Sequence, residues 1–181
     1  MNIQFYFEKL HNSVEFQEFS KEHPDAYLCS GFFVIDKEDK DNRIHFDYFS
    51  PKSKKMVSFQ LESQGDTPFA KPPRKEKEIK KVPLEIFSEK IPDEVSSDVD
   101  LEFNEIEEII LQKMKNEKVN AKIQKMILSL QSLDGKDFII GTIFIPMLGM
   151  IKINLDIKEK KITEFEKKSF FDIMKIMKKG D

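Results

Sequence analysis

Three side chains in this sequence, Asp36, His45 and Asp47, combine the types and the spacing that acid–base chemistry requires. His45 and Asp47 share one face of an expected strand, and Asp36 lies at the end of the strand before it. An imidazole beside carboxylates can move protons if that face lines a pocket. A solvent-facing strand alternates polar residues in the same way, so the pattern also fits a plain surface. We treat the three as candidate ligand-binding residues and assign no catalytic residue.

The other residues with metal-binding or nucleophilic potential are scattered. The three histidines, His11, His23 and His45, fall in different expected elements, and neither H-x-x-x-H nor C-x-x-C spacing occurs near them. A zinc site needs three or four convergent ligands. The single cysteine, Cys29, lies in an apolar run, where burial raises the pKa of a thiol and makes it unreactive. We expect neither a metal nor a cofactor, and the sequence leans away from an enzyme.

A basic segment precedes an acidic one in the middle of the chain. Residues 71–84 carry six basic and two acidic side chains, whereas residues 85–108 carry one basic and ten acidic. Such a pair of blocks is typical of a solvated linker whose ends attract each other. The alternative is an arm that binds RNA or ribosomal phosphates, or an acidic partner, without sequence preference. The candidate residues for that arm are Lys71, Arg74, Lys75, Lys77, Lys80 and Lys81.

Composition predicts a globular protein of the cytoplasm. The chain has 181 residues, 39% of them hydrophobic and 35% charged, with seventeen Phe and no Trp. A lone cysteine rules out a disulfide framework and fits a reducing compartment. The N-terminus shows no secretory leader, and the apolar run 138–151 is shorter than the about 20 residues of a membrane span. We expect no membrane partner.

The elements that must position the candidate residues begin with a meander. Alternating apolar residues predict strands over 26–36, 43–49 and 56–61, joined by short polar turns. Ser13 is a suitable N-cap for a helix from 13 to 22, while residues 1–10 fit a strand and a helix equally well. These elements form an N-terminal module, residues 1–66. A proline-rich linker, 67–100, follows it, with an edge strand expected at 82–87.

The C-terminal module, residues 101–181, is expected to contain helices and a second meander. Apolar spacing predicts helices over 102–116 and 120–133, the latter because Ile123, Met126, Ile127 and Leu130 lie at i, i+3, i+4 and i+7. Strands are expected at 137–145, 150–158 and 161–167, and a final helix at 169–178. The chain should therefore be α+β, with two helix-plus-three-strand antiparallel meanders and helices on one sheet face. Whether the meanders form one sheet or two stays open.

The two modules contain an internal echo. The stretch RIHFDYFSPKSKKMVSFQLE (43–62) resembles MIKINLDIKEKKITEFEKK (150–168), each read as a strand, a lysine-rich turn and a second strand. Such self-similarity is typical of one supersecondary unit used twice. We therefore expect a pseudo-repeat.

Longer segments resemble known families. HPDAYLCSGFFVID and AKIQKMILSLQSLDGKDFIIGTIF resemble a family of small cytoplasmic archaeal proteins of unknown function. NLDIKEKKITEFEKKSFFDIM, a hairpin leading into a short helix, is similar to cystatin-like and PepSY-like folds. Those folds host inhibitors, ligand-binding cups and enzymes alike, so the resemblance implies an architecture and no activity.

The function expected from the sequence is that of a non-enzymatic module that binds another macromolecule. A protein partner is favoured, because a duplicated sheet offers edges and a broad face and the linker offers an adaptable arm. One alternative is a small-ligand-binding or enzymatic cup on the face of Asp36, His45 and Asp47. Another is RNA or ribosome association through 71–81. A homodimer is compatible with all three.

Overall fold

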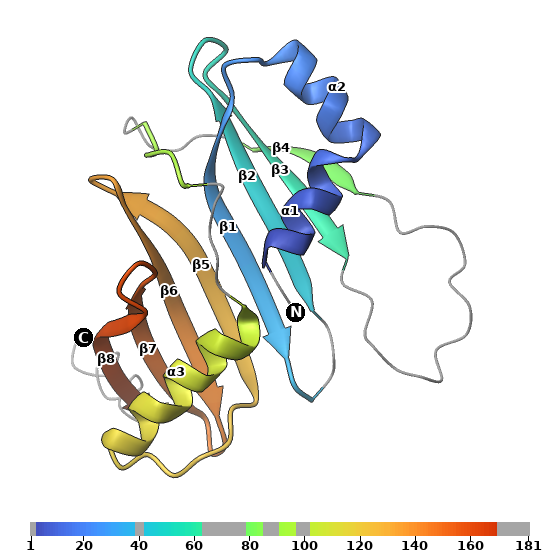
Figure 1. The fold of residues 1–181 in the computed structure, drawn as a ribbon. Coiled ribbons are helices and arrows are strands. Elements are labelled where there is room, and N and C mark those ends of the chain that lie inside the picture. Colours follow the sequence, from blue (N-terminus) through green and yellow to red (C-terminus); the bar gives the residue numbers. More distant parts are fainter. Residues whose placement is uncertain (1–2, 39–41, 63–78, 85–90, 97–101, 170–181) are drawn as a thin grey trace, which may run out of the picture.

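A computed structural model of the chain describes residues 3–38, 42–62, 79–84, 91–96 and 102–169, and within these ranges it contains three helices and a single antiparallel sheet of eight strands (Figure 1). The predicted α+β class is confirmed. The predicted terminal helix, 169–178, and most of the predicted linker lie outside the described residues.

The N-terminal half contributes two helices and four strands. These are α1 (Ile3–His11), α2 (Val14–Glu22), β1 (Tyr27–Asp36), β2 (Arg43–Ser50), β3 (Lys55–Glu62) and β4 (Lys80–Leu84). Residues 3–11 form a helix because Ile3, Phe7 and Leu10 then bury on one side. Ser13 caps α2 as predicted, and its Oγ accepts the Phe16 N–H at 3.2 Å.

The C-terminal half contributes one helix and four strands. These are α3 (Phe103–Asn116), β5 (Lys125–Leu133), β6 (Lys136–Ile145), β7 (Gly149–Asp156) and β8 (Lys161–Ser169). Among the helices in the described ranges, none is long and apolar enough to span a membrane.

The predicted helix over 120–133 is wrong, because most of that segment is the strand β5. Met126, Leu128 and Leu130 alternate into the core, each fully buried, while the residues between them face the other way. The strand is central and bonds to β1 on one side and β6 on the other, which outweighs the helical spacing. Asp134 and Gly135, both with positive φ, form the tight hairpin turn into β6 and not a helix end.

The two halves share one continuous sheet. Its strand order is β4-β3-β2-β1-β5-β6-β7-β8, and the antiparallel pair β1–β5 joins the halves. β4 forms one edge and overlaps the predicted edge strand 82–87, with Pro83 placed where an edge tolerates proline. The division into 1–66, 67–100 and 101–181 stays a prediction.

All three helices pack on one side of the sheet, here called the helix face (Figure 1). Under α1 and α2 the core is aromatic, with the Phe7 and Phe46 rings stacked at 4.3 Å. Under α3 it is mainly aliphatic. Phe33 of β1 meets Phe103 of α3 at 5.1 Å, so the two parts form one core. The opposite side, the far face, carries no helix among the described residues.

The echoing segments both form hairpins. In each, a four-residue turn, 51–54 or 157–160, ends on a lysine with positive φ, Lys54 or Lys160. However, β2 and β3 are the first half's second and third strands, whereas β7 and β8 are the second half's third and fourth. The turns are alike, but the β7–β8 pairing has a register shift between Asn154 and Leu155 whereas the β2–β3 pairing is continuous. The positions in the sheet also differ by one strand, so the pseudo-repeat stays a prediction.

Candidate functional site

Residues 91–96, here called the strap, fill a gap at one end of the sheet. β1 and β5 pair only from Ser30 opposite Gln131 onward, which leaves the start of β1 without a β5 partner. The Val95 N–H donates to the Leu28 carbonyl at 2.8 Å and takes that place. Val95 is also 2% exposed, so the strap is anchored by packing as well as by its backbone.

Three further hydrogen bonds hold the strap. The Tyr27 hydroxyl donates to the Pro92 carbonyl at 2.7 Å. On the other side, the Asp134 N–H donates to the Asp93 carboxylate at 3.0 Å, and the Ser96 N–H donates to the Asp137 carboxylate at 3.2 Å. The strap is thus clamped between β1 and the β5–β6 hairpin, and a cavity lies on either side of it.

The cavity on the far face, here called the cup, has a volume of about 470 Å³. It runs under the first residues of the strap and across strands from both halves. Three of its side chains are large, apolar and exposed: Ile91 (62%), Leu133 (50%) and Ile140 (47%). Among the described residues, the cup is lined by Cys29, Ser30, Met56, Ile91, Pro92, Asp93, Gln131, Ser132, Leu133, Phe138, Ile140 and Asn154.

The polar groups of the cup include one without a partner. The Asn154 Oδ1 atom is shielded from solvent and makes no hydrogen bond. By contrast, the Ser30 hydroxyl donates to the Asp47 carboxylate at 2.5 Å, and the Cys29 thiol donates to the Asp47 carbonyl at 3.2 Å. Burial, with a smaller contribution from Asp47, raises the pKa of Cys29 to about 12, so this thiol is protonated and unreactive at neutral pH.

The second cavity, about 600 Å³, lies on the helix-face side of the strap, and we call it the aromatic cleft. His11 Nε2 and the Tyr48 hydroxyl lie 2.8 Å apart in its wall, with the Phe16 ring 4.5 Å from the imidazole. Burial lowers the pKa of His11 and raises the pKa of Tyr48. Both groups are therefore neutral at pH 7, and the pair links α1 to β2.

The predicted ligand-binding residues Asp36, His45 and Asp47 all lie on the far face, but spread along it. Asp47 touches the cup through Ser30. His45 lies opposite Phe32 with the two rings 5.8 Å apart. Burial lowers the pKa of His45, Asp47 opposes that shift, and Arg43 adds to it. Asp36 follows Ser30 by six residues on β1, about 20 Å along the strand.

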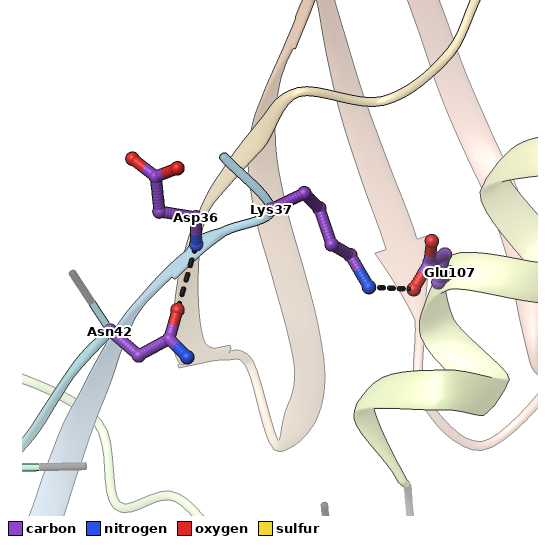
Figure 2. A network of polar contacts seen from close by, with 4 residues as sticks. All are labelled: Asp36, Lys37, Asn42 and Glu107. Carbon is purple, nitrogen blue, oxygen red and sulfur yellow. Dashed lines mark hydrogen bonds and ion pairs between the residues drawn. The ribbon is translucent and has the colours of Figure 1, made fainter. Parts of the chain in front are cut away.

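Asp36 has a structural environment of its own. Its carboxylate lies 3.0 Å from the Lys125 ammonium and accepts the Glu38 N–H, while its own N–H donates to Asn42. Figure 2 shows the Asp36 carboxylate turned away from the neighbouring Lys37, which pairs with Glu107 of α3 at 2.6 Å. This end of β1 joins the halves, and the Asp36 carboxylate is remote from the cup.

Two of the six predicted basic-arm residues are described. Lys81 lies over the Phe19 ring at 5.3 Å and 3.7 Å from Glu22, on the helix face. Lys80 is opposite Gln60 in the ladder and so faces the other way. Lys71, Arg74, Lys75 and Lys77 lie outside the described residues, and the arm stays a prediction.

Sequence reasoning missed the cup because its parts come from distant segments. Ile91 comes from the strap, Leu133 and Ile140 from the β5–β6 hairpin, and Asn154 from β7. One signal was available: a large apolar residue at 140 lies out of phase with the core-facing Ile139. Within the described parts of the chain, no three His, Cys, Asp or Glu side chains group as a metal site would require.

Comparisons with known proteins identify a fold and no family. No family model and no curated protein matches the sequence. A crystal structure of a Clostridium difficile 630 protein named a "putative lipoprotein" is similar, with a TM-score of 0.54 and 13% sequence identity. The match covers 85% of this chain and 90% of that one. At this identity the likeness shows the fold alone.

Proposed function

We propose that this protein is a non-enzymatic module that binds another macromolecule, a protein above all, through the cup on its far face. The observation that carries this proposal is the convergence of Ile91, Leu133 and Ile140 on one concave site. Soluble chains rarely gather large exposed apolar side chains around a hollow unless something binds there. Anchors of protein interfaces are apolar or aromatic side chains that fill such hollows.

The arrangement of the polar groups favours binding over catalysis. Asp36 pairs with Lys125, and Asp47 accepts from Ser30 directly, so the Ser30 hydroxyl is not aligned with an imidazole base. A serine nucleophile is usually activated by an imidazole that a third group orients, and the described hydrogen bond of Ser30 goes to a carboxylate instead. Cys29, the other nucleophilic side chain of the cup, has a pKa near 12.

A small ligand in the cup is the second candidate function. The volume of about 470 Å³ lies within the usual range for small-molecule sites, and the lining combines large apolar side chains with polar ones. The unpartnered Asn154 Oδ1 would orient such a molecule.

We also propose a family and a cellular compartment for this protein. Two helices precede four antiparallel strands in the first half and one helix precedes four in the second, which supports the cystatin-like resemblance. Membership in the archaeal family rests on the segments quoted above. A cytoplasmic location rests on the lone thiol, and the alternative is a membrane-anchored location, since the similar Clostridium protein is named a lipoprotein. Fractionation of source cells separates the two.

The test is affinity capture from source lysate with wild type, Ile140→Asp and Leu111→Asp. Leu111 is a matched control, 41% exposed on α3. The captured protein is identified, purified and titrated against all three by calorimetry. We expect a stoichiometric complex that Ile140→Asp weakens about tenfold or more and Leu111→Asp leaves intact. Equal affinities for the three proteins would overturn the proposal, and so would the capture of no stoichiometric partner.

A further inference from the structure

The hydrogen-bonding groups of the cup define what can bind there. Several donors in its lining are already used: Ser30 and Cys29 donate to Asp47, and the Gln131 amide donates one N–H to Ser129 at 2.9 Å. The remaining groups are the amides of Gln131 and Asn154, which carry both a carbonyl oxygen and N–H groups, and the Asp93 carboxylate, which only accepts. An occupant that brings N–H or O–H donors would satisfy the Asp93 carboxylate and the unpartnered Asn154 oxygen together.

The unpartnered Asn154 oxygen is the most specific of these observations. A shielded acceptor without a partner costs roughly the desolvation of that group, so a fold selected for stability alone would place an apolar residue there. The side chain lines the cup, and its terminal torsion is soft. A half-turn about that torsion exchanges the oxygen and the amide nitrogen, so the oxygen can face the cup and accept from an occupant.

The charge of the described lining indicates the charge of the molecule that the cup would bind. Asp93 is the one charged residue in the described lining, and one of its oxygens accepts the Asp134 N–H. A lysine or an arginine is absent from that described lining. An anionic occupant would meet Asp93 without a compensating cation, whereas a cationic one would be attracted.

We propose that the cup binds a partner-protein segment in which an apolar side chain stands next to a lysine or arginine. The apolar side chain packs among Ile91, Leu133 and Ile140, and the basic side chain and nearby backbone N–H groups reach Asp93 and Asn154. This rests on the proposed function, since it names the partner chemistry for the same site.

The first experiment selects a random heptapeptide phage library on the immobilised full-length protein. We expect enriched peptides to carry an apolar residue beside lysine or arginine, and synthetic copies to bind Ile140→Asp about tenfold more weakly. Asp93→Asn should weaken them about threefold and lower the salt dependence of binding. Enrichment of acidic peptides, or none, overturns the inference.

The second experiment measures Asn154→Leu, which removes the unpartnered oxygen at similar volume. We expect its melting temperature to rise by about 2 °C while its affinity for the selected peptides falls about fivefold. A purely structural amide would give a lower melting temperature, and unchanged peptide affinity would remove Asn154 from the site.

The two proposals fail separately. A lysate partner that needs Ile140 yet presents an acidic segment keeps the proposed function and overturns the inferred chemistry. A small molecule that shifts the methyl resonances of the cup, with no peptide enriched, overturns the inference and moves the function to the second candidate.

Discussion

The two faces of the sheet differ in how completely their side chains are buried and hydrogen-bonded. On the helix face, Phe46 is fully buried, stacked on Phe7 and edge-on to Phe33. On the far face, Ile140 is 47% exposed and Asn154 holds an oxygen without a partner. Both faces come from the same strands, since alternate residues point to opposite sides. The difference teaches that the helix face carries the stability of this fold, while the far face retains unfavourable features that binding would relieve.

The largest expected effect is on the helix face. Phe46→Ala removes a ring at the centre of the aromatic core and should lower the free energy of unfolding by about 3–5 kcal/mol. Ile140→Thr, the far-face control, keeps a β-branched residue at an exposed site and should stay within about 0.5 kcal/mol. Urea titrations measure both, and similar losses would erase the contrast between the faces.

The strap should show an intermediate effect. Val95 is 2% exposed, and Val95→Ala removes two buried methyl groups, which should cost about 2 kcal/mol. Glu94→Ala, one residue away and exposed, is the control and should cost little. If both changes are neutral in urea denaturation, the strap does not belong to the core.

A smaller effect is expected at the clamp between β1 and the strap. Tyr27→Phe deletes the hydroxyl that donates to the Pro92 carbonyl and should cost about 1 kcal/mol. Because that bond holds the outer end of the strap, hydrogen exchange at the Val95 amide should speed up. Exchange at the Leu130 amide, in the sheet centre, serves as the internal reference. An unchanged Val95 rate would show that the clamp is unimportant.

The smallest effect is the dependence of stability on pH through His11. Burial lowers its pKa from the ordinary 6.5, so the unfolded chain binds a proton at a higher pH than the folded one. The His11 contribution is complete above about pH 6.5 and is lost as the pH falls through the folded pKa. His11→Gln should therefore flatten the decline between pH 7 and 5 that urea titrations record. An equally steep decline would assign the effect elsewhere, for example to His45.

Much of the fold could be predicted because strand alternation is a local signal. The expected strands 26–36, 137–145 and 150–158 match β1, β6 and β7 within about two residues. The strand β5 was predicted as a helix because its apolar residues satisfy both helical and strand spacing. Only its pairing with β1 and β6 decides between the two. Local spacing holds no information about that pairing.

The candidate site was predicted only in part, for a similar reason. The far face of β1 and β2 was singled out, and Asp47 does touch the cup through Ser30. The remaining cup residues meet only after the strap docks at Leu28 and β5 pairs with β1. We grouped Asp36 with His45 and Asp47 because the sequence predicts that their two strands are neighbours. Their separation along those strands depends on the β1–β2 register, which the sequence does not give.

The claim that the far face is the binding face can be tested most directly by photo-crosslinking in source lysate. A benzophenone side chain is placed at Ile140 in one protein and at Leu111 in another, both exposed positions on opposite faces. The account predicts one discrete protein adduct from position 140, lost when Ile91→Asp is added, and none from position 111. An adduct from position 111 alone, or none from position 140, would contradict it.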